Sequence, residues 1–323
     1  MFDVVTIGET MLRFSPDGFS RWDQAESLQV HIGGSESNTA VGLARLGMRV
    51  CWLSRLTDND FGRRIARTIA AHGVDTQHVV WTDEDRVGTY YYEEGSPPRS
   101  SRVIYDRAAS AFTQYSADQL PRQLFAPLNA TLLHITGISL ALGETSRELI
   151  HSAVKQAKQA GWLVSFDLNY RAKLWSPNEA REHCEPLFSQ ADIAFIPKRD
   201  ATTIFGLSSA DTPLDVLSSL TTKRDGKLTV MTIGTEGSAA KMHDDFCIET
   251  ITPVQPIGRL GGGDAFSAGF LYAWLTYRDM RVAIKWATAC ASLKYSIPGD
   301  LPLFQKSEVT SLVAQTNDLR NFR

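Results

Sequence analysis

Residues 259–275 read RLGGGDAFSAGFLYAWL, a glycine-rich turn that runs into a stretch with helical spacing. Large apolar residues recur there every three or four positions, as on a buried helix. The free backbone N–H groups at such a helix start, together with the helix dipole, form an anion site. Three consecutive glycines carry an entropy cost that ligand binding would offset. We therefore expect Gly261, Gly262 and Gly263 to hold an anion, with Asp264 beside it.

Asp264 has a chemical use in that place. Beside a transferring phosphoryl group, a carboxylate can accept the proton of an attacking hydroxyl. The alternative is that Asp264 is only a favourable acid in the first helical turn, where Asp is common. The turn is neither a Walker A loop, since no GxxxxGK[ST] occurs, nor a dinucleotide fingerprint, since the first strand runs into Gly8-Glu9-Thr10.

A second glycine-rich stretch, GGSESNTAVGLARLG, occupies residues 33–47. Gly33 and Gly34 would let the backbone approach a ligand closely, and Asn38 could hydrogen-bond to that ligand. The alternative is a tight turn into a packing helix of small residues that ends at Gly47. The residues alone favour this alternative, because Gly-Gly turns are common.

Short apolar runs alternate with helical patterns along the chain. Strands are predicted at residues 4–8, 50–55, 131–135, 163–167, 193–196 and 228–233. Helices are predicted at 145–160 and 177–188, and the second begins with a capping box of Ser176 and Glu179 around Pro177. This alternation predicts an α/β fold with a mainly parallel sheet flanked by helices, and ligands at the carboxyl ends of its strands.

Two regions, about residues 11–31 and 88–111, break the alternation. The second reads as a hairpin, with aromatic and β-branched strands around the turn Ser96-Pro97-Pro98. Tyr105 and Arg107 are two positions apart on its second strand and so face the same side. We interpret the two regions together as a small β-sheet lid that projects from the edge of the main sheet.

Composition excludes several classes of protein. The chain has 323 residues and a formal net charge of −3, so nucleic acid is not an expected partner. Its four cysteines form no CxxC pair, which fits a reducing compartment. The first residues read as a strand rather than a signal peptide, and no apolar run is long enough to span a membrane. We expect a cytoplasmic protein with no membrane partner.

The two glycine motifs together resemble the signatures of the ribokinase-like, or pfkB, carbohydrate kinases. Gly33-Gly34, Asn38 and the small residues up to Gly47 match the N-terminal signature. Gly261-Gly262-Gly263-Asp264-Ala265-Phe266 resembles the C-terminal signature, which usually reads D-T-x-G-A-G-D. The motifs stand in the expected order near opposite ends of the chain, and the resemblance covers nearly all of it.

The resemblance implies one doubly wound α/β domain over residues 1–323, with a β lid. It implies ATP and Mg²⁺ as cofactors, a sugar or sugar acid as the small-molecule partner, and Asp264 as the catalytic base that acts beside an anion hole at the glycine turn. The nucleotide site would use Gly261 and Gly263 together with the turn of Gly234, Glu236 and Gly237. A monovalent-cation requirement and a homo-oligomer that pairs through the lid are both compatible with it.

A finer resemblance is to the 2-keto-3-deoxygluconate kinases. It is carried by Tyr90, by YDRAASA at 105–111, by DLNYRAKLW at 167–175 and by Pro298-Gly299-Asp300. It implies that Tyr90, Tyr105 and Asn169 contact the substrate and that Arg107 and Arg171 clamp its carboxylate, for which a planar guanidinium is well suited. The alternatives are ordinary lid-strand residues for Tyr105 and Arg107, and a surface residue for Arg171.

Three positions depart from the family pattern. Gly258 stands where the first Asp of the C-terminal signature is usual. Pro197-Lys198-Arg199-Asp200 replaces an Asn-x-x-Glu motif, so that only Asp200 remains as a candidate metal ligand. Thr232 stands where Lys or another polar residue often precedes the nucleotide-site turn. Gly258 and Pro197 keep open the alternative of a non-catalytic sugar-binding or regulatory protein on the same fold. Among enzymes, the alternative is a neutral-sugar kinase of the fructokinase or ribokinase type.

Overall fold

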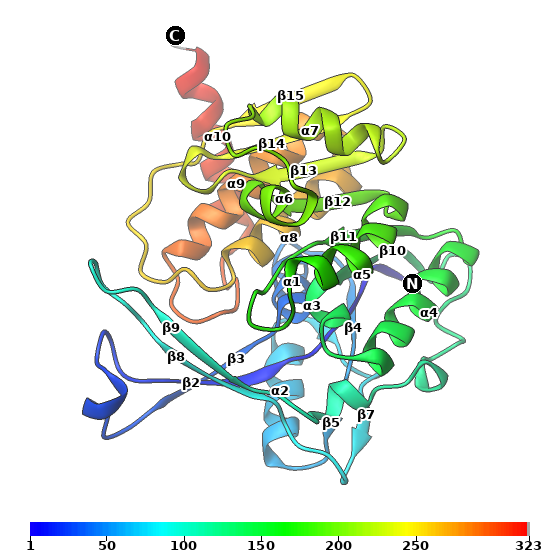
Figure 1. Cartoon of the computed structure of the whole chain (residues 1–323), viewed down its shortest axis with the longest axis vertical. Helices are drawn as coiled ribbons and strands as arrows, with labels where there is room; N and C mark the ends of the chain where they lie inside the picture. The colour runs from blue at the N-terminus through cyan, green and yellow to red at the C-terminus, as the bar shows by residue number, and fades with distance from the viewer. Residues whose placement is uncertain (322–323) are drawn as a thin grey trace.

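A nine-stranded sheet runs through the computed structural model, which describes residues 1–321, with side chains as far as residue 315 (Figure 1). The strand order is β15-β14-β13-β12-β11-β10-β1-β4-β6. All neighbouring strands are parallel except at one edge, where the pairs β13–β14 and β14–β15 are antiparallel. The bounds are β1 Phe2–Ile7, β4 Val50–Leu53, β6 Val74–Asp75, β10 Ala130–Thr136, β11 Leu163–Asp167, β12 Ile193–Pro197, β13 Leu228–Thr232, β14 Ser238–Met242 and β15 Asp245–Glu249. The predicted mainly parallel α/β sheet is confirmed.

One predicted strand, at residues 50–55, is too long. The chain leaves the main sheet after Leu53, and β5 (Arg55–Thr57) pairs instead with β7 (Val80–Thr82) in a separate two-stranded sheet. Ser54 occupies the break, where its hydroxyl donates a hydrogen bond to the carbonyl of Gly8 at 2.8 Å. A buried side-chain hydrogen bond therefore ends the strand at a point where the apolar pattern continues.

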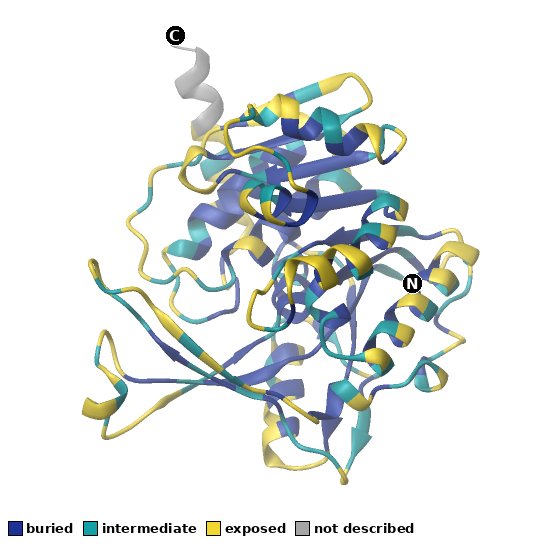
Figure 2. Cartoon of the chain, in the orientation of Figure 1, coloured by how far each residue is buried: buried dark blue, intermediate teal, exposed yellow. Residues whose placement is uncertain are grey.

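Helices cover both faces of the sheet and form two buried apolar layers. One face carries α1 (Ser35–Arg45), α2 (Asp60–Ala71), α8 (Gly262–Tyr277), α9 (Met280–Tyr295) and α10 (Lys306–Asn321). The other carries α4 (Glu144–Gln159), α5 (Pro177–Gln190), α6 (Lys198–Phe205) and α7 (Pro213–Thr222). The strands between the two layers are buried (Figure 2). No helix among residues 1–321 is both long enough and apolar enough to cross a membrane.

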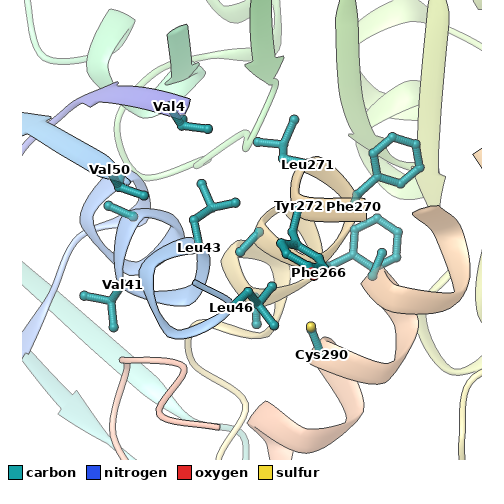
Figure 3. Close-up of a cluster of buried hydrophobic side chains, with 14 of the residues drawn as sticks. Val4, Val41, Leu43, Leu46, Val50, Phe266, Phe270, Leu271, Tyr272 and Cys290 are labelled. Atoms are coloured by element: carbon teal, nitrogen blue, oxygen red, sulfur yellow. The ribbon is translucent and has the colours of Figure 1, made fainter. Parts of the chain in front are cut away.

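The helices that follow the two glycine motifs, α1 and α8, pack against each other. Leu43 of α1 and Leu46, which directly follows this helix, lie with Phe266 and Leu271 of α8 in the apolar layer of Figure 3. The small residues of α1 permit this close approach, since a Cβ on Gly42 would lie only 2.8 Å from Ala268. Their packing brings the N-terminal ends of both helices, and with them the two motifs, to one place.

The lid is a separate four-stranded sheet in the order β3-β2-β8-β9, and it projects at the lower left of Figure 1. Its strands are β2 (Met11–Ser15), β3 (Gln29–Gly33), β8 (Thr89–Glu93) and β9 (Arg102–Asp106). These strands fall in the two regions that break the α/β alternation, so the predicted lid is confirmed. The shorter elements are α3 (Gly137–Leu140) and 3₁₀ turns at Trp22–Gln24, Ala111–Gln114, Ala117–Gln119 and Gly234–Glu236.

The predicted capping box at the start of α5 is also confirmed. The Ser176 hydroxyl accepts a hydrogen bond from the Glu179 N–H, and the Glu179 carboxylate accepts one from the Ser176 N–H. Pro177 occupies the first turn, where its missing N–H costs nothing. This helix leads the chain from β11 to β12, and both strands end beside the glycine turn of α8.

Candidate active site

Asp264 lies at the meeting point of the two glycine motifs. One of its carboxylate oxygens accepts a hydrogen bond from the Ser35 hydroxyl at 2.6 Å, and the other accepts one from the Asn38 amide at 2.7 Å. Asn169 donates to the same Ser35 hydroxyl at 2.8 Å. The loop after β11 and the start of α1 therefore hold the carboxylate of α8 in one orientation. Sequence reasoning missed Ser35, whose only signal is its place at the start of the helix after Gly33-Gly34.

The environment of Asp264 acts on its pKa in two directions. Burial raises the pKa of this carboxyl, while the hydrogen bonds from Ser35 and Asn38 lower it. A general base must be ionised, so these two donors favour the form that could accept a proton. The arrangement can therefore take a proton from a hydroxyl placed next to Asp264.

The three glycines of the turn have different reasons to be glycine. Gly261 has a φ of +75°, and a Cβ there would lie 2.0 Å from the backbone oxygen of Asp300. A Cβ on Gly262 would lie 2.4 Å from the ring of Tyr295. At Gly263 a Cβ would meet nothing within 4 Å, so this residue borders open space at the helix start. Protein packing thus requires glycine at positions 261 and 262 but not at 263, and all three residues border the same cavity.

The first motif shows the same distinction. A Cβ on Gly33 would lie 2.4 Å from the Tyr90 hydroxyl oxygen, and one on Gly34 would lie 2.1 Å from the carbonyl oxygen of Glu9. These glycines therefore allow other parts of the protein to come close, namely the lid and the loop that follows β1. Both glycines nevertheless border the pocket in front of Asp264.

That pocket, of about 120 Å³, lies between the lid and the glycine turn. It gathers most of the predicted substrate residues, namely Gly33, Gly34, Asn38, Tyr90, Tyr105, Arg107, Arg171 and Asp264. Asn169 borders the neighbouring cavity instead, and reaches this pocket only through Ser35. We call this space the sugar pocket.

The two arginines of the sugar pocket differ in whether an acidic side chain pairs with them. Arg107 is nearly buried and forms an ion pair with Glu9, which also accepts a hydrogen bond from Ser110. The Nε of Arg107 is buried without a hydrogen-bond partner in the described chain. The Arg171 side chain is exposed, and it forms no hydrogen bond or ion pair with any described residue. Arg171 is therefore the arginine of the sugar pocket that no ion pair holds, although its charge lowers the pKa of Asp167, Asp200 and Asp264. Glu9 already balances most of the charge of Arg107.

A further ion pair closes the lid side of the pocket. Asp300 accepts a hydrogen bond from the Tyr90 hydroxyl and pairs with the Nε of Arg13 at 2.7 Å. All three side chains are buried. Sequence reasoning named Tyr90 and the segment containing Asp300 but missed Arg13, because the three residues are far apart along the chain.

A second cavity, of about 230 Å³, lies on the other side of the glycine turn. It is bordered by three arginines (Arg171, Arg199 and Arg259) and by the acids Asp167, Asp200 and Asp264. A smaller cavity continues from it along Thr232, Gly234, Gly237 and Tyr295. Of the residues predicted for the nucleotide site, Gly234 and Gly237 border this smaller cavity, whereas Glu236 borders neither cavity. We call the two cavities together the phosphate cleft.

Cationic side chains and a helix start fit a polyphosphate, and two buried acids fit a divalent cation beside it. Burial, together with the nearby charge of Asp264, raises the pKa of Asp167 to about 8. Burial also raises the pKa of Asp200, which lies 3.1 Å from the Nε of Arg199. Mg²⁺ in proteins is commonly held by one or two carboxylates plus substrate phosphates. Asp167 and Asp200 would supply the carboxylates, and Asp167 is a candidate that sequence reasoning did not name.

The position of the missing family acid, Gly258, is not enforced by packing. A Cβ there would meet only the carbonyl oxygen of Ile297, at 3.9 Å. An acidic side chain would therefore fit, and its absence is a property of this sequence rather than of the backbone. Thr232, the third departure, borders both cavities of the phosphate cleft.

Comparison with known proteins agrees with this geometry. The family model described as "pfkB family carbohydrate kinase" matches residues 1–302. The chain is 37% identical to a 2-dehydro-3-deoxygalactonokinase of Haloferax volcanii over 95% of both chains. It is 28% identical to a 2-dehydro-3-deoxygluconokinase of Bacillus subtilis over 93% of this chain and 91% of that one. The crystal structure of a 2-dehydro-3-deoxygluconokinase from Thermotoga maritima superposes with a TM-score of 0.91, at 28% identity, over 97% of this chain and 98% of that one.

Proposed function

Because the chain belongs to the pfkB family of carbohydrate kinases, we propose that it transfers the γ-phosphoryl group of ATP to a hydroxyl of a keto-deoxy sugar acid. The unpaired guanidinium of Arg171 in the sugar pocket carries this choice of substrate. A neutral sugar has no group that needs an unpaired guanidinium, whereas a carboxylate binds one through two parallel hydrogen bonds. The relatives named for 2-dehydro-3-deoxygalactonate and 2-dehydro-3-deoxygluconate support the same class, and 2-keto-3-deoxygluconate is the first candidate.

In this proposal the sugar hydroxyl lies against Asp264. As its oxygen attacks the γ-phosphorus, the proton passes to the Asp264 carboxylate, and the bond to the leaving ADP oxygen breaks. The backbone N–H groups of the glycine turn stabilise the charge that spreads over the phosphoryl oxygens. Mg²⁺, when bound, supplies further positive charge to the phosphates, and Asp167 and Asp200 are the residues that would hold it.

The test is a coupled assay of ADP release with a panel of sugar acids and neutral sugars. We expect 2-keto-3-deoxygluconate or its galactonate epimer to give the highest kcat/KM. We expect Arg171→Gln to raise KM for the acid about 10–100-fold, since a hydrogen bond to a charged group contributes about 1.5–3 kcal/mol. The matched control is Arg181→Gln, which removes an exposed arginine on α5 that is paired with Glu185.

One outcome would overturn the choice of substrate, and another would overturn the kinase activity itself. If Arg171→Gln weakens a neutral sugar as much as the acid, the pocket does not read a carboxylate. Arg107→Gln serves as a second probe, with a smaller selective effect because Glu9 already pairs with that guanidinium. Binding of sugars with no turnover of any panel member would favour the non-catalytic alternative.

The lid also supports a proposal about assembly. Its outer face carries Phe14 stacked on Tyr91, with ring centroids 5.6 Å apart, and Ile104, which is 52% exposed and lies opposite Tyr91 in the strand register. We propose that this face pairs with the lid of a second copy. Analytical ultracentrifugation should show a dimer that Ile104→Glu dissociates, and a strict monomer at all concentrations would contradict the pairing.

A further inference from the structure

Lys294 is a buried cation without an acidic partner. It lies in the last turn of α9, and its side chain is 0% exposed. Its ammonium donates hydrogen bonds to the backbone carbonyls of Ile297 at 2.8 Å and Gly299 at 3.0 Å. In the described part of the chain no carboxylate forms an ion pair with it. Burial of an unpaired charge is expensive, so the position calls for a functional explanation.

The place of Lys294 suggests that explanation, because it lies under the glycine turn. A Cβ on Gly261 would lie 3.3 Å from the Cε of Lys294 and 2.0 Å from the backbone oxygen of Asp300. Lys294 and the turn at residues 297–300 therefore form the surface on which Gly261 rests. Gly261 in turn is the residue before α8, whose first turn carries Asp264.

The same turn also connects to the lid. The Asp300 carboxylate, one residue beyond Gly299, binds Arg13 of β2 and Tyr90 of β8. The ammonium thus holds a turn that touches the catalytic glycine loop with its backbone and the lid with its side chain. A shift of this turn would move both walls of the sugar pocket.

The atoms around the ammonium are those that bind a monovalent cation. Backbone carbonyl oxygens are the ligands that replace the water shell of K⁺ in selective sites. An ammonium is a compact point charge that can take the same place. Burial lowers the pKa of Lys294 to about 8, with Arg13 acting in the same direction and Asp300, Asp264 and Glu94 opposing it. The group is therefore still mainly charged at neutral pH.

We propose that Lys294 is a positioning residue for phosphoryl transfer, and that its ammonium acts as a built-in monovalent cation which makes the kinase independent of K⁺. The inference rests on the kinase activity and not on which sugar is phosphorylated. It assigns a role to a residue that touches neither substrate, because it acts through the turn at 297–300 and through Gly261.

The first test uses the unmodified enzyme. Turnover of its best sugar is measured in chloride salts of K⁺, NH₄⁺, Na⁺ and tetramethylammonium at equal ionic strength. We expect kcat to differ by less than about twofold among these salts, because no cation site is left open. A severalfold activation by K⁺ or NH₄⁺ would overturn the proposal.

The second test replaces the ammonium. Lys294→Met keeps the apolar stem and removes the charge, and we expect kcat to fall about 10–100-fold, the usual effect of losing charged hydrogen bonds. Lys294→Ala opens a space at the carbonyls, and its kcat should rise again severalfold with K⁺ or NH₄⁺ but not with tetramethylammonium. Lys155→Met, an exposed change on α4, is the control and should leave kcat unchanged in every salt.

A third readout does not depend on turnover. The Tm of Lys294→Ala should rise with K⁺ or NH₄⁺ relative to tetramethylammonium, while the Tm of the unmodified enzyme should not. If no sugar is phosphorylated at all, the proposed function fails, but this melting experiment still tests the cation site. Full activity of Lys294→Met, or no selective effect of K⁺ on Lys294→Ala in either assay, would refute the role of the ammonium.

Discussion

Replacement of Asp264 by Asn tests the chemistry assigned to the site. The amide has the size of the carboxylate and can keep both hydrogen bonds, since its oxygen can accept from Asn38 and its NH₂ can donate to the Ser35 hydroxyl. It cannot accept a proton. We expect kcat to fall about 10²–10⁴-fold, which corresponds to about 2.7–5.4 kcal/mol on the barrier.

The other acids that border the sugar pocket are already held by hydrogen bonds or ion pairs, and Glu36 accepts hydrogen bonds from Thr136 and Ser139. Asp300 is held by Arg13 and Tyr90, and Glu9 is held by Arg107 and Ser110, so neither is free to turn toward the hydroxyl. The glycine turn is untouched in the variant, and its N–H groups should still stabilise the phosphoryl charge. Activity should therefore fall steeply without reaching zero.

The assay must isolate the chemical step, because product release limits kcat in many kinases with a lid. Single-turnover measurements with excess enzyme meet this need, and the Tm and substrate affinity of the variant show that its fold and pocket are intact. Asp60→Asn is the matched control, since Asp60 is an exposed acid in the first turn of α2. A single-turnover rate for Asp264→Asn within about threefold of the unmodified enzyme would leave Asp264 as a first-turn acid only.

Three further predictions follow from burial and hydrogen bonding. Ser35→Ala removes a donor that lowers the pKa of Asp264, so the acid limb of the kcat profile should move to higher pH, and an unmoved limb would contradict the assigned base. The pKa of Asp167 is raised to about 8 in the fold, so the contribution of this carboxyl to stability is present at low pH and is lost as the pH rises through about 8. Asp167→Asn should therefore raise the Tm of the Mg²⁺-free protein by an amount that grows from about pH 4 to about pH 8, and a gain that does not depend on pH would refute this. Phe270→Ala should lower the free energy of unfolding in urea by about 3–5 kcal/mol, because the Phe270 ring is fully buried and packs edge to face on Phe195, with ring centroids 5.5 Å apart. A loss below about 1 kcal/mol would mean that the layer between α8 and the sheet can repack.

The features that the sequence predicts well are local or periodic. The capping box of Ser176 and Glu179 depends on neighbours along the chain, and the helix after the glycine turn depends on spacing within one segment. The lid hairpin is marked by aromatic strands around a proline turn. Each of these signals lies within about 20 residues, so the sequence contains both partners of the interaction in one window.

The sequence predicts poorly those contacts that form between residues far apart along the chain. Arg107 looks like a free cation in the sequence, and only the fold shows that Glu9, on the loop after β1, balances it. Gly261 and Gly262 look like ligand-binding glycines and do border a cavity, but the sequence does not reveal that Asp300 and Tyr295 also require glycine there. In each case the deciding partner arrives through the packing of another element, so no pattern in a single segment could have revealed it.

Gly258 and Lys294 approach the same backbone oxygen, that of Ile297. A Cβ at position 258 would lie 3.9 Å from this oxygen, and the ammonium of Lys294 donates a hydrogen bond to it at 2.8 Å. An acid at position 258 and a bound K⁺ would place opposite charges at this turn. Gly258 and Lys294 instead supply the positive charge alone, through the ammonium of the lysine. The double variant Gly258→Asp with Lys294→Ala should therefore bind K⁺ more tightly than Lys294→Ala alone, measured as the K⁺ concentration that half-restores kcat. If the added acid leaves that concentration unchanged, the two positions are independent and the absence of the acid at Gly258 needs another explanation.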